Sequence, residues 1–337
     1  MRAPERLAAA GGARSAPSLT RRALLPVAGL LLPSGARAAA PGAATILVPG
    51  PEQGALAHWT QRLSQRTGRV GPLAAPPRLA VVGGPDGVTA ANRFATTDPG
   101  DGRLLLTLPG AAMLAHFSGS ERVGYDPRNW TPLCLSWSEA LIAGRGPLPA
   151  GPGRAPLRFA LPAPDTPEGG AVLALESLGL PTTPMPLAAS LPGASEHAFA
   201  QGQVDALLLT GPDSAARAAR VGATPWLGFG LPARTVPDYA TLPVPQPALQ
   251  QATQAAIGAG RLSAALVLPA LTSADMVAAW RQAAQRWLDA EQNQPGAPGI
   301  PLGGAEAAQV MSGLTPSAEA ILAWRDWLAR RLSWHPN

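Results

Sequence analysis

Few side chains in this sequence combine the types and spacings that catalysis requires. The four histidines, His58, His116, His197 and His335, are far apart, and no acidic residue stands at the offset that a metal site needs. No serine occupies the glycine-flanked turn of a hydrolase nucleophile, since Gly119-Ser120 lacks that pattern. The glycine pairs also fall short of a dinucleotide-binding fingerprint. The sequence therefore predicts no enzyme, no metal site and no cofactor.

The recurring chemical feature is a turn rich in glycine and proline that follows a short apolar segment and leads into a helical pattern. Such turns occupy residues 49–54, 83–87, 108–111 and 162–166. In open parallel sheets, ligands bind at the carboxyl ends of the strands, and the amides and dipole of a helix start favour anions such as carboxylates. We expect the ligand to be bound by Pro51, Glu52, Gln53, Gly54, Gly87, Thr89, Pro109, Gly110, Ala111, Asp165, Thr166 and Asp213.

The turn that ends at Thr166 is the best formed of the four. Thr166 is a suitable helix N-cap and Pro167 suits the first helical position, so the Thr166 hydroxyl and the amides beyond it could receive a carboxylate oxygen. The alternative is that Thr166 only caps its own helix. The sequence leaves both interpretations open.

The elements that position these turns follow from the alternation of short apolar runs with helical patterns, which is typical of strand-helix-strand units around a parallel sheet. The expected strands are residues 45–48, 79–82, 104–108, 157–161, 204–209 and 264–268. The expected helices are residues 55–66, 110–117, 167–178 and 213–219. Two stronger helices close the chain and begin at residues 272–275 and 315–316. Their tryptophans are expected in the core: Trp280, Trp287 and Trp324.

The first 38 residues differ in composition from the rest and are typical of an export leader. A basic stretch ends in Arg21-Arg22, an apolar run continues to Leu32, and small residues predict cleavage after Ala38. The paired arginines favour the twin-arginine route, with the general secretory route as the alternative. The apolar run is much shorter than the roughly 20 residues of a membrane-spanning helix. We therefore expect a cleaved signal peptide, residues 1–38, and a periplasmic protein.

The remainder of the chain is electrically balanced. The sequence holds 26 basic residues, all arginine, against 21 acidic residues, and six of the arginines and one glutamate lie in the leader. Equal numbers remain, which argues against a nucleic-acid binder. Cys134, the only cysteine, stands between leucines in an apolar strand pattern and is expected to be buried. The core must then hold this chain without an internal disulfide.

Length suggests about two domains in the roughly 300 residues after the leader. Two stretches rich in proline and glycine, residues 144–155 and 231–247, are predicted to connect one lobe with the other. They divide the chain into a discontinuous lobe I, residues 39–142 and 256–334, and a central lobe II, residues 143–255.

Several short segments stand in a characteristic order: Ile46–Pro49, residues 98–106 with Asp-Pro-Gly-Asp-Gly before a leucine run, Tyr125-Asp126-Pro127, Phe159-Ala160 with Thr166, and Gly202-Gln203-Val204-Asp205. This order resembles the Bug family, the periplasmic receptors of tripartite tricarboxylate transporters, over nearly the whole mature chain. The resemblance implies an α/β periplasmic binding protein fold in which two lobes, each a mainly parallel sheet flanked by helices, clamp a carboxylate-bearing ligand in the cleft between them. It implies membrane transporter subunits as partners and no catalysis. We also expect a monomer.

Three departures from the family pattern fall in the binding loops. The first loop is shorter and holds Glu52, the lysine of the family's Pro-Tyr-Lys-Gly turn is missing from residues 186–189, and a histidine is replaced by Gly169. Losing a cation and gaining Glu52 would disfavour a di- or tricarboxylate. A monocarboxylate, an amino acid whose ammonium meets Glu52, or a neutral compound stay open. In the alternative, Glu52 points into solvent.

The sequence thus predicts a receptor that captures a small organic acid or amino acid for a tripartite tricarboxylate-type transporter. One alternative is a degenerate receptor that acts as a sensor or scaffold. The other is a hydrolase or transferase in the same cleft, for which the scarcity of His, Cys and Lys leaves few candidate groups.

Overall fold

The structure is a computed structural model that describes residues 43–67, 75–97, 100–149, 155–187, 193–230, 237–242, 244–292 and 299–336. The expected leader lies outside these residues. All described residues belong to one compact unit. None of the described helices combines the length and the apolar character needed to cross a membrane.

The first sheet has six strands in the order β11-β4-β10-β3-β1-β2. Its strands are β1 (Thr45–Pro49), β2 (Arg78–Val82), β3 (Leu104–Leu108), β4 (Trp130–Trp137), β10 (Leu262–Pro269) and β11 (Ile300–Gly303). β1 runs parallel to β2 and β3, whereas β10 is antiparallel to β3 and β4, and β11 is antiparallel to β4. The carboxyl ends of β1, β2 and β3 therefore meet at one edge of this sheet.

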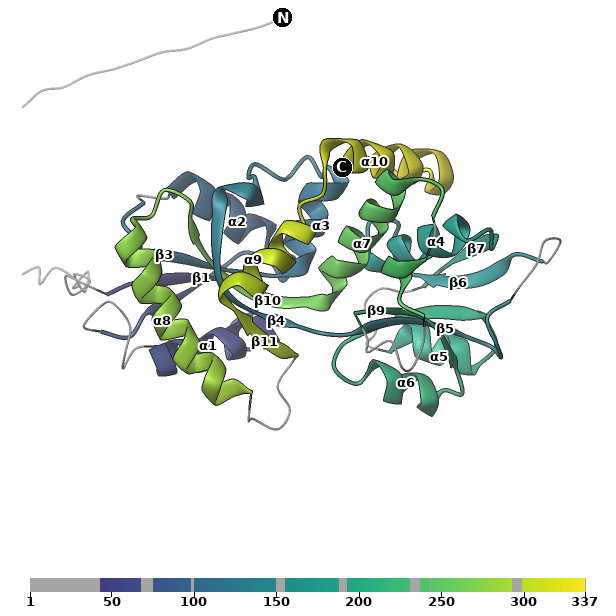
Figure 1. The fold of residues 1–337 in the computed structure, drawn as a ribbon, viewed down its shortest axis with the longest axis horizontal. Coiled ribbons are helices and arrows are strands. Elements are labelled where there is room, and N and C mark those ends of the chain that lie inside the picture. Colours follow the sequence, from purple (N-terminus) through teal and green to yellow (C-terminus); the bar gives the residue numbers. More distant parts are fainter. Residues whose placement is uncertain are drawn as a thin grey trace, which may run out of the picture. The chain divides into compact units, whose positions relative to one another are not determined.

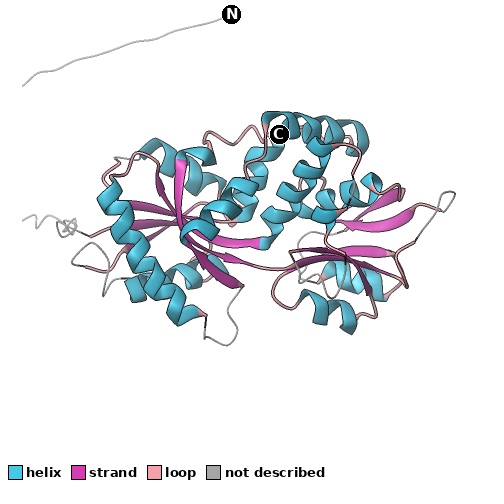
Figure 2. Cartoon of the chain, viewed as in Figure 1, coloured by secondary structure: helices cyan, strands magenta, loops and turns pink. Residues whose placement is uncertain are grey.

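Helices cover both faces of the first sheet (Figure 2). On one face, Ile46 and Cys134 pack with α1 (Ala55–Thr67) and α8 (Ala274–Glu291), where the rings of Trp59 and Trp287 meet edge to face at 5.2 Å. On the other, the next residues along the strands pack with α2 (Val88–Thr97), α3 (Gly110–Ser118) and α9 (Gly304–Gly313). Strands buried on both faces explain the short, purely apolar runs of the sequence.

The second sheet has five strands in the order β7-β6-β8-β5-β9. Its strands are β5 (Ala140–Gly144), β6 (Leu157–Leu161), β7 (Thr182–Pro186), β8 (Ala206–Thr210) and β9 (Thr224–Phe229). β6 is parallel to β7 and β8, and β5 is antiparallel to β8 and β9. One face packs with α4 (Pro167–Ser177) and α7 (Pro247–Arg261), the other with α5 (Ala194–Ala200) and α6 (Ser214–Arg220). The expected fold class is confirmed, with both sheets mixed.

The chain passes between the two sheets at two places that lie side by side. β4 continues into β5 through Ser138 and Glu139, and α7 of the second half leads into β10 of the first at Arg261 (Figure 1). The N–H and hydroxyl of Ser138 donate to the Arg261 carbonyl at 2.9 and 3.0 Å, and Arg261 Nε donates to the Ser138 carbonyl at 2.8 Å. These bonds tie the two crossings together.

The prediction that residues 144–155 and 231–247 cross between lobes is wrong. The first stretch connects β5 with β6 inside the second sheet, and the second leads from β9 to α7 on the same side. The crossings run instead through Ser138-Glu139 and through the junction between Arg261 of α7 and Leu262 of β10. The expected lobe boundaries at residues 142 and 255 stay a prediction.

The last helix, α10 (Ala318–Leu332), begins after Ser317, whose side chain accepts from the Ala320 amide, and so starts later than the expected Thr315. Its Trp324 is fully buried and donates from Nε1 to Ser118 Oγ of α3 at 3.1 Å. Arg331, in its last turn, reaches Glu176 of α4 at 2.9 Å. The three expected core tryptophans are all buried. α10 therefore contacts both α3, which packs on the first sheet, and α4, which packs on the second.

Candidate functional site

The turns that follow β1, β2 and β3 lie against one another. A methyl group added at Gly50 would stand 2.6 Å from the carbonyl oxygen of Gly83, and one at Gly87 would stand 2.5 Å from Cγ of Pro109. Gly83 and Gly87 have positive φ angles of 71° and 77°, which L side chains adopt reluctantly. Glycine at these places lets three helix starts gather at one edge of the first sheet.

The last turn of α7 lies between the start of α3 and the start of α4. A methyl group at Gly110 would be 1.8 Å from the carbonyl oxygen of Ala259, and one at Gly260 would be 2.8 Å from Cβ of Pro167. The same methyl group at Gly260 would be 3.2 Å from Cγ2 of Thr210, at the end of β8. The turns after β3, β6 and β8 therefore approach one short stretch of α7.

The expected binding residues differ in exposure. Gly87, Pro109 and Gly110 are buried, and Gly54 and Thr166 are half-buried. The remaining members are exposed at their turns: Pro51, Glu52, Gln53, Thr89, Ala111, Asp165 and Asp213. The structure thus brings the β3, β6 and β8 ends to α7. Binding by these twelve residues stays a prediction.

The Thr166 hydroxyl does not cap α4, so the capping alternative is wrong. Thr166 occupies the N-cap position, but its side chain makes no capping hydrogen bond, and Oγ1 donates instead to the carbonyl of Ala163 at 2.7 Å. The tight turn brings that carbonyl closer than the helix amides. With its proton engaged, the hydroxyl can only accept further hydrogen bonds, so a carboxylate at this turn would have to bind through backbone amides.

Sequence reasoning missed Glu168, in the first turn of α4. Burial raises the pKa of its carboxyl group, and a hydrogen bond from its own backbone amide opposes this only in part. A neutral carboxyl can donate a hydrogen bond to a ligand anion, whereas its charged form would repel the anion. The sequence signal was an acid directly after the Thr166-Pro167 helix start.

Glu168→Gln is expected to raise the midpoint of thermal unfolding at pH 7.5, on the order of 1 °C or more. A raised pKa means that the folded state holds the proton more tightly than the unfolded state, so this contribution to stability is present at low pH and is lost as pH rises through the folded pKa. The gain should therefore shrink toward pH 4. Thermal melts of both proteins over this pH range check it, and a gain that grows on acidification would contradict it.

Several residues of the family-like motifs have packing roles. Tyr125 is buried and its hydroxyl donates to the Ala112 carbonyl of α3 at 2.7 Å. Asp205 accepts from the amide, Nε and Nη2 of Arg158, which pins the start of β8 to β6 and lowers the pKa of Asp205. A methyl group at Gly169 would lie 2.4 Å from the Pro164 carbonyl oxygen, so no larger side chain fits there. Asp98, Pro99, Ala188 and Ala189 lie outside the described residues.

No cluster of three or more His, Cys, Asp or Glu side chains among the described residues could hold a metal ion. Cys134 is buried as expected, and burial raises the pKa of its thiol. Glu139, in the crossing between the sheets, accepts from the hydroxyl of buried Ser214 at 3.4 Å, at the start of α6.

The sequence matches no protein-family model and no curated protein. The fold, in contrast, is similar to that of solved structures. A TctC solute-binding protein from Polaromonas, without ligand, superposes with a TM-score of 0.59 at 14% identity over 83% of this chain and 97% of that one. MatC from Rhodopseudomonas palustris with bound malate superposes with a TM-score of 0.50 at 19% identity, over 85% of this chain and 98% of that one.

These likenesses define the class of fold. The chain has the periplasmic binding protein fold, with two mixed sheets flanked by helices. The resemblance drawn from the order of short motifs is confirmed at the level of the fold, since the similar solved structures include a TctC solute-binding protein.

Proposed function

We propose that this chain is an exported receptor that captures a small carboxylate-type ligand and presents it to a membrane transporter. The supporting observation is the approach of the α3 and α4 starts to the same turn of α7, in a fold shared with a TctC solute-binding protein. Helix starts leave unpaired amides that favour anions. The malate bound to MatC makes malate the first probe.

The ligand class depends on Glu52, which is exposed in the turn after β1. If Glu52 meets an ammonium group, Glu52→Gln should weaken the binding of amino acids. If it only repels anions, the same change should strengthen the binding of dicarboxylates. An unchanged affinity for both would place Glu52 in solvent.

A pair of variants at Ala111 gives the sharpest test of the site. Ala111 is exposed in the first turn of α3, where a glutamate is favourable for the helix dipole. Ala111→Glu should therefore keep the protein folded while it lowers the affinity for a carboxylate by about tenfold or more, because like charges repel. Ala111→Gln is the control of equal size and should bind more tightly than Ala111→Glu.

The measurement is calorimetric titration of protein purified from the periplasm, with malate, monocarboxylates and amino acids that score in a thermal-shift screen. Equal affinities of the two Ala111 variants would move the ligand away from α3. If no acid, amino acid or neutral compound binds the wild-type protein, the receptor proposal fails and a scaffold becomes the better account.

Export is part of the proposal. The N-terminus of the periplasmic protein should lie near residue 39. Replacing Arg21 and Arg22 by lysine keeps the charge and should block the twin-arginine route only. A periplasmic chain that still begins at Met1 would contradict cleavage.

A further inference from the structure

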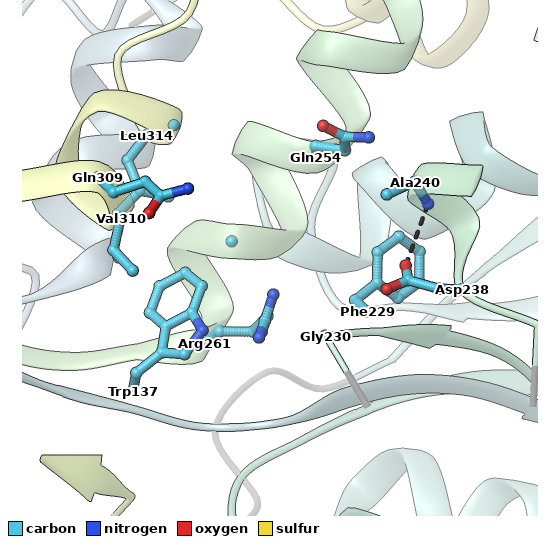
Figure 3. A pocket seen from close by; sticks show the side chains of 12 residues that line it. Trp137, Phe229, Gly230, Asp238, Ala240, Gln254, Arg261, Gln309, Val310 and Leu314 are labelled. Atoms are coloured by element: carbon cyan, nitrogen blue, oxygen red, sulfur yellow. Dashed lines mark hydrogen bonds between the residues drawn. The ribbon is translucent and has the colours of Figure 1, made fainter. Parts of the chain in front are cut away.

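A cavity of about 320 Å³ lies on the face of α7 that points away from α3 and α4. Gln254, Gly258 and Arg261, spaced as neighbours on one helix face, form one wall, whereas Ala259 and Gly260 face the proposed carboxylate site. Figure 3 shows the cavity between α7, α9 and the segment around Asp238. It is therefore distinct from the gathered turns.

The cavity has both charged and apolar walls. Trp137, at the end of β4, and Phe229, at the end of β9, contribute aromatic surface, and Val310 and Leu314 of α9 add aliphatic surface. Asp238 precedes the short helix η2 (Tyr239–Thr241) and accepts from the Ala240 amide at 3.0 Å.

Arg261 supplies a half-buried cation. Its Nε donates to the Ser138 carbonyl at 2.8 Å, and its guanidinium carbon stands 4.3 Å from the centre of the Trp137 ring. Burial lowers the pKa of Arg261 to about 10, although Asp238 and Glu139 raise it in part. The group therefore stays charged at neutral pH.

The terminal nitrogens of Arg261 are left for a ligand. No described residue accepts a hydrogen bond from Nη1 or Nη2, and the ion pairs of the described residues include none of Arg261 with Asp238 or Glu139. The terminal nitrogens pack beside Gly230, where an added Cβ would stand 2.3 Å from Nη2. Guanidinium N–H groups that are partly removed from water and have no acceptor are costly, and the planar fork of these groups matches a carboxylate. Figure 3 shows the guanidinium directed into the cavity above Trp137.

We propose that this cavity is a second binding site, which takes a small monocarboxylate with an apolar body. The carboxylate would meet Arg261, and the body would lie on Trp137 and Phe229. Asp238 disfavours a second negative charge and would accept from an ammonium group, so an apolar α-amino acid satisfies both charges of the site. None of the residues from which this site is inferred belongs to the proposed carboxylate site at the gathered turns.

The walls come from both halves of the molecule. Trp137 and α9 belong to the first sheet and its helices, and Phe229 and η2 belong to the second. A ligand here would contact both halves next to the hydrogen-bonded crossings. Any change in their arrangement would then change its affinity, and by linkage its binding would change the affinity of the other site.

The test uses L-phenylalanine and 3-phenylpropionate, which share the carboxylate and the ring but differ in the ammonium group, with calorimetric titration of the full chain after export. Arg261→Gln should weaken both by about tenfold or more. Asp238→Asn keeps the acceptor for the Ala240 amide and should weaken phenylalanine alone. 3-Phenylpropionate should bind this variant equally or more tightly.

Arg261→Gln also loses part of the contact with Ser138, so a second variant guards against misfolding. Gly313→Phe adds a ring from the exposed end of α9, where a new Cβ meets no atom within 4 Å, and should block both ligands. Leu322→Ala on α10, 66% exposed, is the control. Absence of binding by the wild-type protein, or binding unchanged in Arg261→Gln and Gly313→Phe, would overturn the proposal.

Discussion

Replacing Trp324 by alanine is expected to lower the free energy of unfolding by about 3–5 kcal/mol. Trp324 is fully buried, stacks on Phe117 and Trp327 with ring centres 5.2 and 5.4 Å apart, and donates to Ser118. The substitution removes the buried aromatic surface of Trp324 and leaves a cavity. It also removes the N–H group that donates a hydrogen bond to the buried hydroxyl of Ser118.

Urea denaturation followed by circular dichroism measures the effect. Leu322→Ala, on the exposed side of the same helix, should change stability by about 0.5 kcal/mol or less and serves as the control. A Trp324→Ala protein as stable as the control would mean that α10 does not hold α3 and α4 together. Trp324 also packs against the start of α4, since a methyl group added at Gly169 would stand 3.4 Å from its ring. The substitution should therefore also loosen the packing of the start of α4.

Several strands that are buried on both faces could be predicted, because their sequences are short and purely apolar. Residues 104–108 and 157–161 are strands over the expected ranges, and Cys134 is buried within β4. β5, β7, β9 and β11 were missed. The last three are edge strands that contain proline, at Pro184, Pro225 and Pro301, and such strands form through pairing with a neighbour rather than through an apolar pattern. β5 is apolar, but the expected lobe boundary at residue 142 was placed inside it.

The helix α7 was missed because its start was included in a supposed linker. Pro247 was read as the end of a proline-rich connection, whereas it stands in the first turn of a 15-residue helix. The missed helix is the one that α3 and α4 approach. No single sequence can show that residue 260 contacts residue 167, since the contact depends on how two sheets are joined.

The candidate turns could be located, but the chemistry of their side chains could not. Strand-to-helix turns follow from local sequence, and the structure places three of them in contact. The direction of the Thr166 hydroxyl depends on the position of the Ala163 carbonyl in the folded turn, and the raised pKa of Glu168 depends on its burial in the folded protein. Arg261 gave no signal, because a single arginine at a helix end is ordinarily solvated.

Gly110→Ala is expected to lower the free energy of unfolding by about 3 kcal/mol, at the upper end of the range for overpacking. The new Cβ would lie 1.8 Å from the Ala259 carbonyl oxygen and 2.9 Å from that of Leu262, so α3 and α7 would have to move apart. Both contacts are with backbone atoms, which cannot rotate away as a side chain would. Gly110 is thus required by helix packing whether or not its amide binds a ligand.

The same substitution in an open place gives the matched control. Gly313 ends α9 and a new Cβ there meets nothing within 4 Å, so Gly313→Ala should stabilise the protein by up to about 0.5–1 kcal/mol, because alanine restricts the unfolded chain and favours the helix. Urea denaturation of the two variants should therefore give changes of opposite sign. A Gly110→Ala protein of wild-type stability would show that α3 and α7 do not approach as closely as described, and the common site at the end of α7 would lose its support.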